Sequence, residues 1–191
     1  NIGVTATDSS TLGAYELEST AEITASSGTA TAAAAKTALT TALADAADYT
    51  VKGSFGSATV KVDAGADARD VAKSFNLSAG TTGINATAIT KASITGLGKA
   101  TTISFTLQGK STSASTVNAT VDSTSNLTAL KDAINSVSGA TGISASLTTD
   151  LSGINLVQQE GYDIVIGDVT TSHVSGAMTV KVADKSGAAQ G

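Results

Sequence analysis

The sequence predicts an α+β fold of two tandem ββαβ(β) units, each with an antiparallel sheet and one helix, plus an N-terminal Ala-rich helix and terminal strands. Three observations lead to this prediction. Apolar residues recur at a spacing of three and four in two segments, as on one face of a helix. Short alternating apolar runs bounded by glycine flank these segments, as strands do. The two segments also align without gaps, which indicates an internal repeat.

The second unit, residues 101–169, has the clearer pattern. Its helix is predicted from the apolar stripe Leu127, Leu130, Ile134 and Val137, and it should stop near Gly139. Alternating runs predict a hairpin before the helix and three strands after it. These runs are Ile103–Leu107 and Val117–Val121 for the hairpin, then Ile143–Leu147, Ile154–Val157 and Asp163–Ile166.

The first unit, residues 49–97, has the same order of elements. Tyr49–Lys52 and Ala58–Val62 predict a hairpin with a glycine-bearing loop. A helix is expected to begin at Asp67, whose side chain can accept a hydrogen bond from the first turn. A strand is then expected from Ile84 to about Ile94.

The repeat is visible when Asp67–Thr90 is placed over Asn126–Thr149, a shift of 59 residues from residue 67 to residue 126. In this register Asn76 falls on Asn135, and both units share a glycine followed by isoleucine after the helix. We expect the residues 96–98, Gly-Leu-Gly, to act as a hinge between the units.

The two ends of the chain are less regular. Residues 1–48 are expected to contain strands around Ile2–Ala6 and Tyr15–Ile23, then an Ala-rich helix from Thr31 to Asp48. Residues 170–191 are expected to hold a strand at Ala177–Val182 and a flexible tail. Terminal strands paired at one pole would suit a domain inserted into a longer chain, and the Asn1 start indicates a processed or excised fragment.

Composition excludes several classes of partner and cofactor. The net charge is −5 with only 11 basic residues, which argues against nucleic acid or an anionic membrane as a partner. No apolar run approaches the roughly 20 residues of a membrane span. The chain has no Cys, so disulfides and thiolate metal sites are excluded.

No motif in the sequence indicates catalysis. The single His, His173, lies in a polar linker without a G-x-S-x-G elbow, so we interpret it as solvated surface. Asp63, Asp67 and Asp70 are clustered, but their spacing matches no calcium loop, and a helix cap with a solvated face explains them. Asp168, after Gly167, is interpreted as a turn residue. We predict no enzyme activity, cofactor or metal.

The Gly-rich runs at residues 80–83 and 139–142 follow helices and contain no Lys. Phosphate-binding loops open helices instead of following them. We therefore interpret both runs as helix-terminating turns.

The repeated helix, glycine turn and following strand resemble the IN motif of bacterial flagellins and hook-associated proteins. The residues that carry the resemblance are Ala133-Ile134-Asn135, Gly142-Ile143-Ser144-Ala145, Gly153-Ile154-Asn155-Leu156 and Gly161-Tyr162-Asp163-Ile164, with Gly83-Ile84-Asn85-Ala86 in the first unit. The resemblance implies a structural protein: a surface-exposed variable domain of a flagellin, extracellular, on the flagellar filament, contributing an antigenic surface and lateral contacts.

The resemblance also carries expectations about partners. Flagellins polymerise through heptad-rich terminal helices that these 191 residues lack, so we expect contacts with other flagellin subunits to use those regions and the isolated fragment to be monomeric. Host antibodies are possible partners of such a surface. The alternative function is a binding module of a filament cap, a hook-associated protein or a secreted adhesin.

Flagellins are modified more often on Ser and Thr hydroxyls than on Asn. Two hydroxyl-rich loops are therefore candidate modification sites. The candidates are Ser111, Thr112, Ser113, Ser115 and Thr116 in one loop, and Ser123, Thr124 and Ser125 in the other.

Overall fold

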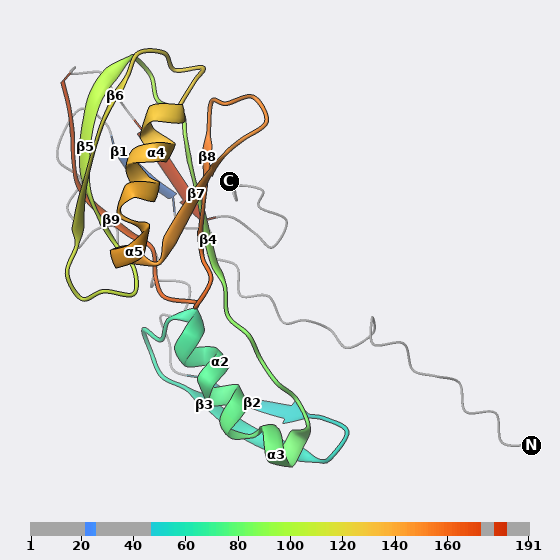
Figure 1. Cartoon of the computed structure of the whole chain (residues 1–191). Coiled ribbons are helices and arrows are strands. Elements are labelled where there is room, and N and C mark those ends of the chain that lie inside the picture. The colour runs from blue at the N-terminus through green and yellow to red at the C-terminus, as the bar shows by residue number, and fades with distance from the viewer. Residues whose placement is uncertain (1–21, 26–46, 173–177, 183–191) are drawn as a thin grey trace, which may run out of the picture.

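The computed structural model describes residues 22–25, 47–172 and 178–182, and these residues confirm the α+β class (Figure 1). Several predictions from the ends of the chain lie outside this part. They are the strand Ile2–Ala6, the Tyr15–Ile23 strand except for its last two residues, the Ala-rich helix up to residue 46, and His173.

Two antiparallel sheets form the main body. One has three strands in the order β6-β5-β9: β6 is Ser115–Val121, β5 is Thr101–Gln108 and β9 is Val165–Thr171. The other has five strands in the order β1-β10-β4-β8-β7: Glu22–Ala25, Met178–Val182, Thr90–Thr95, Ile154–Gln158 and Ile143–Leu147. The structure confirms the hairpin predicted before the second helix. It also confirms the first two of the three strands predicted after that helix, and the strand near the C-terminus.

The helix α4 (Thr128–Ser136) joins the two sheets because it packs against β6 on one side and β7 on the other. Its stripe residues Leu127, Leu130 and Ile134 have no exposed surface. The same core contains Phe105 of β5 and Ile94 of β4. Burial alternates along β5 and β6, so each presents one face to this core and the other to solvent.

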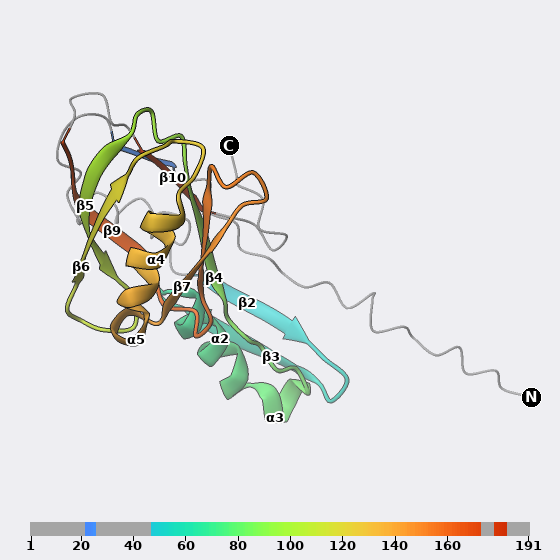
Figure 2. The ribbon, with the colours of Figure 1, turned by 45° about the horizontal axis from the view of Figure 1, so that its top comes forward.

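The first unit is smaller. β2 (Ala47–Lys52) and β3 (Ser57–Val62) form a two-stranded sheet, beside which lie α2 (Ala68–Leu77) and α3 (Ala79–Thr82). Figures 1 and 2 both show these four elements grouped at one end of the molecule, below the main body. The predicted cap is confirmed, since Asp67 accepts from the Asp70 N–H at 2.7 Å.

The two units differ in how completely they bury their matching residues. Leu130 and Ile134 of α4 are fully buried, whereas Val71 and Phe75, at the same positions of α2, are half-buried. The first unit touches the main body near Gly161, whose carbonyl accepts from the Arg69 N–H at 3.0 Å. The Arg69 guanidinium lies 4.7 Å from the centre of the Tyr162 ring.

Several predicted boundaries are wrong. The strand expected from Ile84 begins only at Thr90, because residues 84–89 pair with no strand in the described part of the chain. Ala47 and Asp48, placed at the end of the Ala-rich helix, belong to β2. β9 starts at Val165 and runs to Thr171, so it lies later than Asp163–Ile166 and includes the first two residues of the polar linker.

The helix ends also lie later than expected. α4 is followed directly by α5 (Ser138–Thr141), so the helical segment passes Gly139 and ends at Gly142, whose φ is 70°. The first unit does the same at Gly83, with a φ of 75°. The Gly-rich runs are thus short helices closed by a left-handed glycine, as helix termini often are.

Pairing of strands from the two ends of the chain is confirmed, because β1 pairs antiparallel with β10 from Glu22–Lys181 to Ala25–Met178. β4, which the sequence assigns to the first unit, pairs with β10 and β8 in the main body. The domain limits at 48, 97, 101 and 169 remain proposals.

Candidate functional site

The same asparagine clamp occurs in both units. Asn135 of α4 donates from Nδ2 to the Ala145 carbonyl at 2.9 Å and accepts from the Ala145 N–H at 2.8 Å. Asn76 makes the equivalent pair with Ala86, at 2.9 and 2.7 Å. One amide side chain therefore satisfies both backbone groups of a residue ten positions later and ties the helix to the segment that follows it.

A buried threonine supports each clamp. Thr141 donates from its hydroxyl to the Val137 carbonyl at 3.1 Å and accepts from the Ile143 N–H at 3.2 Å. Thr82 of the first unit bonds in the same way to Ser78 and Ile84. Repetition of both networks at the shift of 59 residues shows that they belong to the repeated unit.

In each unit a glycine at the end of the first hairpin strand packs against the carbonyl of the buried threonine. A Cβ added to Gly109 would lie 2.1 Å from the Thr141 carbonyl oxygen, and one added to Gly53 would lie 1.8 Å from that of Thr82. Only a residue without a side chain allows this approach of two backbones. The sequence alone gave these asparagines, threonines and glycines no role, although their recurrence in both units was the available signal.

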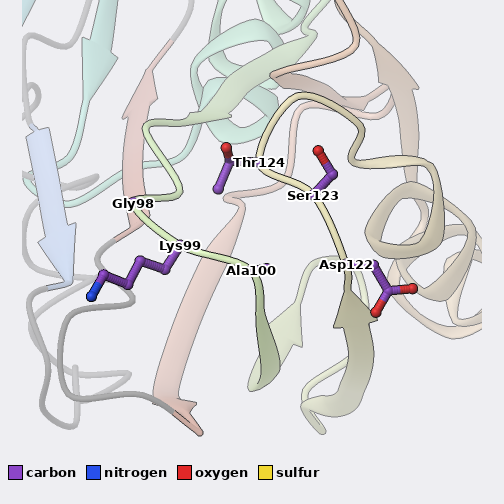
Figure 3. A pocket seen from close by; sticks show the side chains of 6 residues that line it. All are labelled: Gly98, Lys99, Ala100, Asp122, Ser123 and Thr124. Atoms are coloured by element: carbon purple, nitrogen blue, oxygen red, sulfur yellow. The ribbon is translucent and has the colours of Figure 1, made fainter.

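A hydroxyl-rich surface lies where β5 begins and β6 ends. An open depression of about 500 Å³ is lined there by Gly98, Lys99, Ala100, Asp122, Ser123 and Thr124. Figure 3 shows the Lys99 and Asp122 side chains extending away from each other, so the two charges do not converge on one point.

The hydroxyls around this depression bond mainly to one another. Ser123 and Ser125 share a hydrogen bond of 2.9 Å, and Thr102 and Thr120 share one of 3.2 Å. Ser123 and Ser125 are exposed, and Thr124 is half-buried. This arrangement presents the hydroxyls of Ser123 and Ser125 to solvent.

The structure separates the two groups of candidate modification residues. The loop that contains Ser111, Thr112 and Ser113 precedes β6, Ser115 and Thr116 begin β6, and Ser123, Thr124 and Ser125 follow its end. Thr112, Ser113 and Thr116 are exposed, while Ser111 and Ser115 are half-buried. Two distinct surfaces result, at opposite ends of one strand.

The carboxylates do not form a shared site. Asp67 is used as the α2 cap, and Asp70 lies 4.0 Å from Arg69. In the described part of the chain, no three His, Cys, Asp or Glu residues are grouped to hold a metal ion. Asp168 is not in a turn as predicted: it lies inside β9 with a φ of 51°, where the β5–β9 register shifts, and accepts from Thr106.

Asp150 is a polar feature that the sequence did not reveal. In the turn between β7 and β8, its carboxylate accepts from the hydroxyls of Ser152 and Thr148, each at 2.6 Å. These hydrogen bonds, that of Ser152 first, lower the pKa of Asp150 to about 2. The group stabilises the turn between β7 and β8. Among the described residues, no helix is long and apolar enough to cross a membrane.

The fold and the clamp together define a class of protein: a structural module in which one helix is fastened by an asparagine to the strand that follows it. Residues 102–159 match the family model of the flagellin hook IN motif. This segment spans β5 to the end of β8 and includes Asn135. This match over part of the chain supports a flagellin-related variable region of a flagellin-type structural protein. No curated protein matches the chain.

Proposed function

We propose that this chain is a surface-exposed variable domain of a flagellin, carried on the outside of the flagellar filament. The IN-motif match over residues 102–159 is the observation that carries the proposal. The family implies the bacterial flagellum and assembly with other flagellar subunits. The domain contributes an acidic, hydroxyl-rich surface, lateral contacts between subunits and targets for host antibodies.

The paired outer strands support an inserted domain. β1 and β10 come from opposite ends of the described chain and lie antiparallel, so the chain enters and leaves the five-stranded sheet on neighbouring strands. This geometry lets a filament subunit carry the domain without disturbance of its own core.

Immunogold labelling of native filaments with antibodies against the 191-residue chain tests the proposal. We expect gold along the whole filament. Gold confined to the tip or to the hook would instead support the alternative, a module of a cap or hook-associated protein. No gold on flagella would refute both and support a secreted adhesin.

The same filaments test the modification surfaces. We propose that Ser111–Thr116 and Ser123–Ser125 are modified on hydroxyls in the native protein, because both groups include exposed residues at the ends of an ordered strand. Intact-mass measurement should then exceed the 18.6 kDa polypeptide for the excised domain, and peptide mapping should place the added mass in these loops. An unmodified mass contradicts this proposal.

A further inference from the structure

Among the described residues, β2 has a paired strand on one side only, whereas its counterpart in the second unit has one on each side. In the described part of the chain, β2 pairs only with β3, and residues 47–52 make no other backbone hydrogen bond. β5, the corresponding strand, pairs with β6 on one side and β9 on the other. The repeated unit therefore accommodates a third strand at a position that is open in the first unit.

The correspondence can be followed residue by residue. Thr50 pairs with Thr59, which falls on Asn118 at the shift of 59 residues, and Asn118 pairs with Ser104. Ser104 in turn pairs antiparallel with Thr170 of β9. Thr50 thus lies at a position of β2 to which an antiparallel strand would add.

The sheet of the first unit has only two strands among the described residues. An isolated two-stranded hairpin is marginal in water, and it gains stability from a packed helix or from further strands. Tyr49 keeps 37% of its surface exposed although its ring centre lies 6.2 Å from that of Phe75, which is itself half-buried. An added strand would cover this apolar side of the sheet.

The sequence of β2 is complementary to itself. In an antiparallel pair centred on Thr50, Asp48 faces Lys52 of a second copy, Tyr49 faces Val51, and Thr50 faces Thr50. Opposite charges, an aromatic ring beside a β-branched side chain, and paired threonines are all favourable cross-strand neighbours. A two-fold axis through Thr50 makes each of the first two contacts twice.

The charges also select this register. Tyr49 points toward Phe75, and its neighbours along the strand point to the opposite face of the sheet. The charged residues Asp48 and Lys52 therefore lie on the face away from Phe75, where they are exposed together with Thr50. A shift by two residues in either direction places each charge opposite an uncharged residue or beyond the strand. Charged side chains discourage indiscriminate pairing at sheet edges, and here they allow one pairing.

We propose that β2 is a docking edge for the β2 strand of a second copy of this chain, giving a four-stranded antiparallel sheet in the order β3-β2-β2-β3. This deepens the lateral-contact part of the proposed function. Contacts between six-residue strands are weak in dilute solution, which agrees with the expected monomer. They become effective where copies are held side by side at high local concentration.

Disulfide trapping in solution tests the proposal without a filament, so its failure leaves the proposed surface role standing. The chain has no Cys, and Thr50→Cys places one thiol on the two-fold axis. Opposed residues in antiparallel strands have Cα atoms about 4.5 to 5.5 Å apart, which a disulfide can bridge. The matched control is Thr59→Cys on β3, exposed and paired with Thr50 on the same sheet.

In a glutathione buffer at high protein concentration, we expect disulfide-linked dimer from the Thr50→Cys chain at about ten times the rate of the control. Equal rates overturn the proposal, because either the edge is covered by the chain itself or the copies do not pair there. Circular dichroism of both variants before oxidation establishes that they are folded.

Charge reversal provides a second, independent test. In the Thr50→Cys background, Lys52→Asp places two acids opposite each other in a self-pair, and Asp48→Lys places two bases there. Each variant alone should lose cross-linking by about tenfold. A mixture of the two restores both opposite-charge pairs and should give a mixed dimer, identified by its mass. A mixture that cross-links no faster than the separate variants overturns the register.

Discussion

Replacement of Asn135 by alanine is expected to destabilise the main body by about 2 kcal/mol. The change removes two hydrogen bonds to Ala145, at 2.9 and 2.8 Å, and each such bond contributes roughly 0.5 to 1.5 kcal/mol net. Asn135 and Ala145 are half-buried, so water reaches the freed backbone groups incompletely. For a domain of this size, this loss lowers Tm by about 4 to 8 °C.

Two related variants sharpen the test. Asn135→Asp keeps the acceptor for the Ala145 N–H but replaces the donor with a carboxylate oxygen that faces the Ala145 carbonyl oxygen. Because these two acceptors repel each other, the change should destabilise as much as alanine or more. Asn76→Ala breaks the same clamp in the first unit, where the side chain is exposed, and should cost less than Asn135→Ala.

The measurement is urea unfolding followed by far-ultraviolet circular dichroism, with the free energy of unfolding taken from midpoint and slope. A loss below about 0.5 kcal/mol for Asn135→Ala would show that solvent replaces the clamp without penalty. Equal losses for Asn76→Ala and Asn135→Ala would refute the argument from burial.

Three further predictions concern single sites. Gly109→Ala should destabilise the protein by about 1 to 3 kcal/mol, because the added Cβ would lie 2.1 Å from a backbone oxygen. Gly139→Ala should stabilise it by about 0.5 to 1 kcal/mol, because this glycine is helical and its added Cβ would meet nothing within 4 Å. Calorimetry of both variants compares the two effects. Ile134→Ala should cost about 2 to 5 kcal/mol in urea unfolding, since the side chain is fully buried, and a loss near zero would contradict its place in the core. The pKa of Asp150 is lowered from 3.8 to about 2, so its stabilising contribution is complete above about 4 and is lost as the pH falls through about 2. A carboxyl titration by NMR should show this midpoint, and Ser152→Ala should raise it; a midpoint near 3.8 in the unaltered protein would show that the turn hydrogen bonds do not form.

Local patterns were enough to predict most of the elements of the second unit. The stripe through Leu130 and Ile134 and the alternation along β5 and β6 are properties of neighbouring residues, and each led to the element that the structure contains. The cap at Asp67 is equally local. Helix ends were predicted less well. Each Gly-rich run contains two glycines, and either one could end the helix by sequence alone. In the structure the second one does so, Gly142 or Gly83, with a left-handed backbone.

Partners distant in sequence could not be predicted. Residues 84–89 share the glycine-isoleucine pattern of β7, yet only β7 is a strand, because a strand needs a neighbour. The neighbour of β7 is β8, and the other side of β8 is occupied by β4, so β8 has no side left for residues 84–89. Likewise, nothing in the sequence near Asp168 indicates that it lies where the β5–β9 register shifts and accepts a hydrogen bond from Thr106.

The α+β class, the repeated unit and the resemblance to the IN motif were all predictable from the sequence, because periodicity and internal similarity are contained in the order of residues. The three-dimensional arrangement was needed to show that the asparagines at matching positions are clamps, that the helix of one unit is more completely buried, and that among the described residues β2 pairs on one side only. These depend on which segments meet in space, and sheet pairing joins residues as far apart as Glu22 and Lys181.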